Sequence, residues 1–322
     1  MLKVNGIEIE NAKFNGVDLN KVVINGVTVF EKNKENTIIM RTLNDNVKLS
    51  VVTKYHTSCE VWNAGTKIGV LHSYGGSTIL SIPNKNEDVI IRGIGIKEFY
   101  CSFSAITSLN IQNCPDLEAL DCSRNLLETL NVQEAPALRI LSCLENKLIS
   151  LNLHGLTKLQ TLGCSFNRLT DLNVKDCALL YHLDCSANRL TSLNNVEGLV
   201  RLYYLDCKSN RLTSLNVSGC KALVGLHCSL NQITSLNVQD CPLLNFLACC
   251  NNHISSSMFR NILSVLPNNS YGRAVLYNIL ANPEQNYQDF TRPPELVQAL
   301  NAAKARGWKF YKSVHLSDYY LI

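Results

Sequence analysis

Residues 183–196 read LDCSANRLTSLNNV, and the chain repeats this stretch twice almost letter for letter. Residues 120–132 read LDCSRNLLETLNV, and residues 205–217 read LDCKSNRLTSLNV. The period is 21 residues, with one step of 22 between Cys185 and Cys207. A fixed period of this length is the signature of a repeat architecture, so it decides the fold before any single element is considered. The cysteine recurs at Cys101, Cys122, Cys143, Cys164, Cys185, Cys207, Cys228 and Cys249, and the asparagine three residues later recurs at Asn125, Asn146, Asn167, Asn188, Asn210, Asn231 and Asn252.

Leucines keep the same register, and the repeating unit is L-x-x-L-x-C-x-x-N-x-L-T-S-L-N-V. One coil of this unit cannot bury its apolar side, so we expect successive coils to stack and share a continuous core. Within L-x-C, alternate residues face the same way, so the leucine and the cysteine point inward and the residue between them faces solvent. The asparagine amide is predicted to satisfy backbone groups of its own coil and of the neighbouring coil.

These motifs resemble the leucine-rich repeat family in its short bacterial form, over about residues 94–255 and about eight coils. The resemblance implies an α/β-type leucine-rich-repeat solenoid, which is a ladder of parallel β-strands. We expect β-rich N-terminal domains before the ladder and an α-helical C-terminal cap after it.

The repeated cysteine poses a choice between a metal site, a disulfide, catalysis and simple packing. Neighbouring ladder cysteines would lie about 4.8 Å apart with their Cα–Cβ bonds side by side, which disfavours a disulfide. A linear file of thiols also does not converge on a metal ion. Since a free cysteine behaves as a small buried hydrophobe, we predict packing and neither a metal nor a cofactor. Cys250 is the exception and is predicted to project outward as a surface thiol. The predicted structural ladder consists of Cys122, Cys143, Cys164, Cys185, Cys207 and Cys228 with Asn125, Asn146, Asn167, Asn188, Asn210 and Asn231.

Residues 1–31 contain a second, shorter repeat. Asn-Gly occurs at 5–6, 15–16 and 25–26, between alternating apolar residues. This pattern predicts β-hairpins, because both residues tolerate positive φ; a pentapeptide β-helix is the alternative. So small a unit is marginal in water, so we expect it to dock onto a partner or to oligomerise. The stretch NGVDLNKVVINGVTVFEK also resembles N-terminal segments of bacteriophage and prophage virion proteins, especially tail and fibre components. That resemblance implies an anchor to a virion.

Two further regions flank the repeats. Residues 37–93 alternate between apolar and polar, which predicts a small antiparallel β domain covering the open end of the solenoid. The period stops after Asn252, and residues 256–322 are the expected cap. Two amphipathic segments, SSSMFRNILSVLP (from Ser255) and PPELVQALNAAKARGW, predict helices, and WKFYKSV is expected to be a closing strand. This arrangement resembles the C-terminal cap of bacterial leucine-rich repeat proteins, which implies that a helix and a GW strand seal the last coil.

Composition narrows the classes of function. The net charge is only +4 and charged residues make up 17%, so the dense basic footprint of a nucleic-acid-binding protein is missing. No apolar run is long enough for membrane insertion, and the first residues lack the pattern of a secretory signal, so we expect synthesis in the cytosol. The sequence contains no P-loop, HExxH or G-x-S-x-G motif, and we predict that the protein is not an enzyme.

Solvent-facing strand positions on the concave face are the candidate binding residues. Exposed rings with polar neighbours suit recognition, because rigid rings offer contact area at low entropic cost. The predicted binding residues are Ile140, Leu144, His182, Asp184, Tyr204, Asp206, His227 and Phe246.

We therefore expect a non-enzymatic binding or structural protein of a phage or prophage particle. Its N-terminal segment would contact virion proteins or a second copy of the chain, and its concave face would bind a protein or a glycan. Such a protein would be assembled in the host cytoplasm and located in the virion. The alternative is a bacterial leucine-rich-repeat adhesion or protein-interaction module, at the cell surface or in the cytoplasm.

Overall fold

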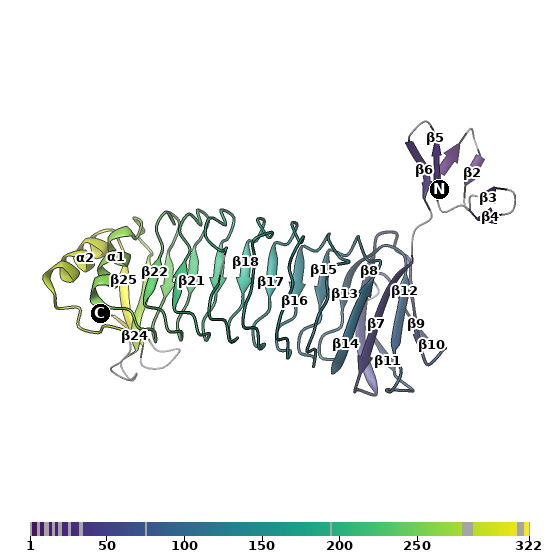
Figure 1. The fold of residues 1–322 in the computed structure, drawn as a ribbon, viewed down its shortest axis with the longest axis horizontal. Helices are drawn as coiled ribbons and strands as arrows, with labels where there is room; N and C mark the ends of the chain where they lie inside the picture. Colours follow the sequence, from purple (N-terminus) through teal and green to yellow (C-terminus); the bar gives the residue numbers. More distant parts are fainter. Residues whose placement is uncertain are drawn as a thin grey trace.

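The computed structural model describes residues 35–74, 76–193, 195–278 and 286–313, and the backbone of the strands within residues 2–31 and 319–321. The repeats stack side by side as a parallel β-solenoid, so the architecture expected from the repeat is confirmed (Figure 1). One strand from each coil joins a single sheet, here named the long sheet. In spatial order its strands are β11 (Thr78–Ser81), β8 (Asn46–Thr53), β13 (Ile96–Tyr100), β15 (Ala119–Asp121), β16 (Ile140–Ser142), β17 (Thr161–Gly163), β18 (His182–Asp184), β19 (Tyr204–Asp206), β21 (Gly225–His227), β23 (Phe246–Ala248), β24 (Arg273–Asn278), β25 (Lys309–Ser313) and β26 (Tyr319–Leu321).

The strands of adjacent coils pair without a shift in register. Leu183 pairs with Leu205 and Leu205 pairs with Leu226, so equivalent residues of every coil form straight rows across the sheet. On the far side of the coils, β20 (Ser214–Asn216) and β22 (Ser235–Asn237) form a second, short parallel pair. These rows place variable side chains at fixed positions on the outside of the long sheet.

The N-terminal cap is built from two sheets that continue into the repeats. A five-stranded antiparallel sheet contains β10 (Thr66–Leu71), β9 (Cys59–Asn63), β12 (Val89–Gly93), β7 (Asn36–Thr42) and β14 (Ile106–Gln112). Its last strand, β14, already belongs to the first coil, and β8 of the cap pairs with β13 of that coil. The boundary expected between residues 93 and 94 therefore runs through continuous sheets and does not separate two packing units.

Residues 2–31 contain three antiparallel strand pairs: β1 (Leu2–Val4) with β2 (Ile7–Ile9), β3 (Lys13–Phe14) with β4 (Val17–Asp18), and β5 (Lys21–Ile24) with β6 (Val27–Glu31). Their innermost pairs are Val4–Ile7, Phe14–Val17 and Ile24–Val27. The docking and oligomerisation expected of this segment depend on side chains that lie outside the described residues.

The C-terminal cap contains α1 (Ser256–Val265) and α2 (Pro294–Ala305), which pack against each other. The Ser255 hydroxyl caps α1 by accepting a hydrogen bond from the Met258 amide at 3.2 Å. The cap also adds two parallel strands, β24 and β25, to the long sheet before the antiparallel β26 ends it. The ladder therefore extends beyond the last residue of the sequence period.

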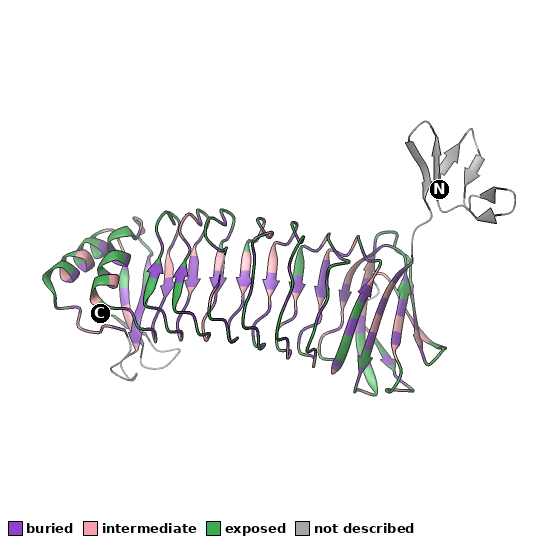
Figure 2. Ribbon diagram, viewed as in Figure 1, coloured by how far each residue is buried: buried purple, intermediate pink, exposed green. Residues whose placement is uncertain are grey.

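The core is one continuous apolar cluster that runs from Ile38 in the N-terminal cap to Phe310 in the C-terminal cap. Figure 2 shows the buried residues recurring coil after coil along the solenoid. Because each coil adds its apolar residues to its neighbours, the caps are needed only where the stack would otherwise end in water.

A candidate binding face on the long sheet

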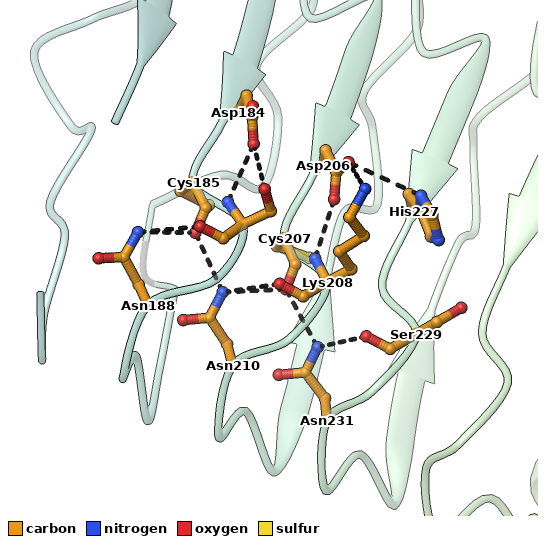
Figure 3. A network of polar contacts seen from close by, with 11 residues as sticks. Asp184, Cys185, Asn188, Asp206, Cys207, Lys208, Asn210, His227, Ser229 and Asn231 are labelled. Carbon is orange, nitrogen blue, oxygen red and sulfur yellow. Dashed lines mark hydrogen bonds and ion pairs between the residues drawn. The ribbon is translucent and has the colours of Figure 1, made fainter. Parts of the chain in front are cut away.

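Ladder asparagines hold the coils at the C-terminal ends of the strands (Figure 3). Asn210 Nδ2 donates to the carbonyls of Cys185 and Cys207 at 3.0 and 3.1 Å, and its Oδ1 accepts from the Leu190 amide at 3.0 Å. One amide thus satisfies backbone groups of two coils, and the same pattern recurs from Asn125 to Asn252. The ladder fixes the backbone from which the outward side chains project.

The ladder cysteines lie inside this frame. All fourteen cysteines of the chain are buried and none is in a disulfide. Burial raises the pKa of the Cys143 thiol to about 12 and the pKa of Cys185 well above its ordinary value, because a thiolate would lose its hydration. Such thiols are neutral and unreactive, which agrees with a packing role.

The geometry of this chain thus combines a parallel strand ladder, an inward leucine and cysteine, and an asparagine ladder. The fold is that of a leucine-rich repeat protein. No protein-family model matches the chain, and no curated protein is similar to it.

Several solved leucine-rich repeat structures are similar to the chain. One is the functional domain of InlJ from Listeria monocytogenes, which includes a cysteine ladder: identity is 27%, the match covers 64% of this chain and 47% of that chain, and the TM-score is 0.44. Another is the leucine-rich repeat domain of APL1B, with 20% identity over 55% of this chain and 56% of that chain and a TM-score of 0.44. A third is the internalin InlF from Listeria monocytogenes str. 4b F2365, with 15% identity, 69% and 87% coverage and a TM-score of 0.33. The chain spans about half the length of the first two.

Outward residues of the long sheet form the candidate face, here named the outer sheet face. Its two central rows are His182, Tyr204, Gly225 and Phe246, and Asp184, Asp206, His227 and Ala248. Most of these residues are only partly exposed, because side chains of adjacent rows cover one another. Ile140 is 49% exposed but lies two strands from His182, and Leu144 lies on the same distant coil, so the structure does not group these two with the others.

Aromatic rings on this face stack on each other from coil to coil. The rings of His182 and Tyr204 lie 5.1 Å apart between centroids and 13° from parallel. The neighbouring pair Tyr181 and Tyr203 repeats this arrangement at 4.9 Å and 12°, with both rings substantially exposed. The coil spacing of a parallel sheet matches the stacking distance of rings, so identical positions on adjacent strands favour this contact.

The carboxylates on this face serve neighbouring groups of the chain. Asp206 is 6% exposed, and its Oδ2 lies 3.1 Å from Lys208 Nζ and 3.7 Å from His227 Nδ1 (Figure 3). Burial lowers the pKa of His227, and Asp206 only partly opposes this effect. Asp184 accepts from the Ser186 amide at 3.0 Å and from its hydroxyl at 2.7 Å. These carboxylates therefore stabilise the ends of their strands.

The face also contains an apolar pocket of about 270 Å³ near the C-terminal ends of β19, β21 and β23. Ala248, Cys250 and Val275 form a small apolar cluster separate from the main core, and Phe246 and Tyr311 pack against it. Cys250 was expected to be a surface thiol, but it is 6% exposed and its Sγ lies 3.2 Å from Ser229 Oγ. The expectation is wrong because β24 continues the sheet and covers this position. The pocket is lined by Phe166, Ala187, Lys208, Ser209, His227, Ser229, Leu230, Ala248, Cys250, Val275 and Ser313.

Phe166 and Leu230 are pocket residues that the sequence analysis missed. Both immediately precede a ladder asparagine and have positive φ, 54° and 59°. The left-handed backbone turns their side chains away from the core, which leaves Phe166 59% exposed. The sequence feature that could have identified Phe166 and Leu230 is a large apolar residue at a position where other coils have Arg124 or Ser209.

Other kinds of site are not supported within the residues that the structure describes. No group of three or more His, Cys, Asp or Glu side chains there is placed to hold a metal ion. No helix among the same residues is long and apolar enough to cross a membrane.

Proposed function

We propose that this leucine-rich repeat protein is a non-enzymatic binding protein whose outer sheet face engages a protein partner. The observation that carries the proposal is that departures from the repeat converge on one pocket. Phe166, Leu230, Cys250 and Val275 are larger or more apolar than the polar or small residues that most other coils have at the same outward positions. Cys250 and Val275 are buried in this pocket, whereas Phe166 is exposed and Leu230 is half-buried. Apolar residues gathered around one accessible hollow are typical of an anchor site for a partner side chain.

A protein partner is favoured over a glycan by the geometry of the rings. Tyr204 has His182 stacked on one ring face and Gly225 against the other, and Tyr181 and Tyr203 each have one ring face covered by their mutual stack. A sugar would need a free ring face. The pocket and the ring edges instead offer apolar contacts, and the Lys208–Asp206 ion pair offers polar contacts beside them, as at the apolar centre and polar rim of a protein interface.

The experiment is to block the pocket and measure binding of the purified protein to its target cells or isolated partner. Leu230→Glu places a charge in the pocket and is expected to weaken binding at least tenfold with little change in melting temperature. Ile149→Glu is the matched control, since Ile149 is 60% exposed and does not line the pocket. Equal binding by the two variants would contradict the proposal.

The finer proposal is that the protein is a component of a phage or prophage virion, assembled in the host cytoplasm. Its support is the resemblance of NGVDLNKVVINGVTVFEK to virion proteins. A bacterial adhesion or protein-interaction module has the same fold and is the alternative. Deleting residues 1–31 should abolish incorporation into particles while the solenoid still folds. Unchanged incorporation, or gene neighbours unrelated to tail and capsid proteins, would favour the alternative.

A further inference from the structure

A row of positive charges lies beside the asparagine ladder, on an edge that the outer sheet face does not use. In four successive coils the residue that follows the ladder asparagine is basic, and the next two coils have Gln232 and His253 there. This row, named the basic edge, consists of Lys147, Arg168, Arg189 and Arg211.

The four cations have no partner of opposite charge in the part of the chain that the structure describes. Arg168, Arg189 and Arg211 are exposed, and Lys147 is half-buried. By contrast, Arg124 on the adjacent row pairs with Glu145 at 3.1 Å. The fold therefore neutralises a nearby arginine but leaves this row unneutralised.

The backbone holds the row at a fixed spacing. The Arg168 amide donates to the Leu148 carbonyl at 2.8 Å, and Arg189 and Arg211 repeat this bond to the preceding coil at 2.9 and 2.8 Å. Coils joined in this way are spaced about 4.8 Å apart. Four like charges at this spacing repel one another, and a chain of anions lying along the solenoid would relieve the repulsion.

Flanking side chains indicate which polyanion fits. The row beside the arginines contains Thr170, Thr191 and Thr213, all exposed, which offer hydroxyl groups. Proteins that bind single-stranded nucleic acids provide successive aromatic rings for the bases to stack on, whereas the two rows that flank the arginines offer a single exposed ring, Phe166. Guanidinium groups pair with sulfate or carboxylate oxygens in a bidentate manner.

We propose that the basic edge binds a linear sulfated polysaccharide that runs along the solenoid axis. None of the four basic residues lines the pocket on the outer sheet face, so either proposal can fail without the other. Binding to four cations would be strongly salt-dependent, with log Kd rising about 3 per tenfold increase in salt.

The test measures heparin binding to the full chain by calorimetry between low and physiological salt. The triple variant Arg168→Gln, Arg189→Gln, Arg211→Gln should bind at least tenfold more weakly, and its salt slope should fall to about 1. The control triple variant Lys158→Gln, Arg201→Gln, Lys221→Gln removes the same charge from exposed residues that precede the strands, and it should bind within twofold of the wild type. Because all six residues are exposed, both variants should melt close to the wild-type temperature, and the single variant Arg189→Gln should weaken binding about threefold.

Three outcomes would overturn the proposal. The control variant could lose as much affinity as the basic-edge variant, which would show unspecific attraction to charge. The basic-edge variant could retain wild-type affinity. Desulfated heparin or a single-stranded RNA of equal charge could bind as tightly as heparin, which would show that sulfate is not what the edge recognises.

Discussion

The ring of Tyr204 lies directly over Gly225 on the next strand, so close that a Cβ at position 225 would be 2.7 Å from Tyr204 Cδ2. The other neighbour of this ring is His182, stacked at 5.1 Å. The position of Tyr204 thus depends on a ring in the preceding coil and on a missing side chain in the following coil. The residues of the row His182, Tyr204 and Gly225 therefore differ in sequence, but each is constrained by the size of the side chain on the adjacent strand.

Gly225→Ala should displace the Tyr204 ring, because the added methyl group cannot fit beneath it. We expect a loss of stability of about 1–3 kcal/mol and a changed near-ultraviolet circular dichroism spectrum, since the stack on His182 is disturbed. Gly163→Ala is the matched control, because the nearest atom to its new Cβ would be Ser142 Oγ at 3.8 Å. Identical spectra for the two variants would contradict the prediction, because they would show that the added methyl group leaves the Tyr204 ring in place.

Asn210→Ala should destabilise the solenoid by about 2–5 kcal/mol, because it leaves buried backbone groups of two coils without partners. Asn216→Ala should cost under about 1 kcal/mol, since Asn216 is exposed and accepts only from the Ser218 amide at 3.0 Å. Urea denaturation of both variants measures the difference. Similar midpoints for the two variants would show that the ladder does not stabilise the fold.

Alkaline pH should destabilise the protein strongly. Burial raises the thiol pKa values of the folded chain, so the unfolded chain releases thiol protons first as the pH rises above about 8.5. Stability is fully present below that pH and falls above it, by up to about 1.4 kcal/mol per pH unit for each buried thiol. Melting temperatures from pH 7 to 10 measure the slope, which should be shallower in the double variant Cys185→Ala, Cys207→Ala. A slope unchanged by these substitutions would contradict the prediction.

Acidic pH should destabilise the outer sheet face through His227. Its pKa in the folded chain is lowered by burial, so the unfolded chain binds the proton first as the pH falls below about 6.5. The stability contributed by the neutral ring is present above that pH and is lost below it. His227→Gln should reduce the loss of stability between pH 6.5 and 5, as measured by urea midpoints. A loss of stability as large as that of the wild type over this pH range would contradict the prediction.

The cysteine and asparagine ladders show which structural features the sequence repeat predicts and where that prediction stops. Burial of every ladder cysteine and the hydrogen bonds of every ladder asparagine follow from a strict period, because each coil repeats its neighbour's environment. Asn286 was missed, although it accepts from the Ile254 amide at 2.9 Å and donates to the Cys249 carbonyl at 2.8 Å, as the next ladder asparagine would. Helix α1 and strand β24 lie between Asn252 and Asn286, so the period is broken in sequence while the geometry continues in space.

The candidate site was only partly predictable. The sequence placed His182 and Tyr204 in one row, since equal positions in adjacent coils must be neighbours. It did not reveal that their rings stack, that Asp206 is buried, or that Phe166 and Leu230 share a pocket with Val275 of the cap. These facts depend on rotamers, on positive φ values and on which cap strand covers the last coil.

By itself, the sequence determined the parallel ladder, the inward cysteines and the amide network. A period of 21 residues gives every coil the same local backbone path and the same packing against its neighbours. Only the tertiary structure decided where the ladder ends, which outward residues are covered and where a pocket forms. Those features arise where the repeat is interrupted. The packing of an interrupted coil cannot be deduced from the adjacent coils, because their sequences differ from it at the same positions.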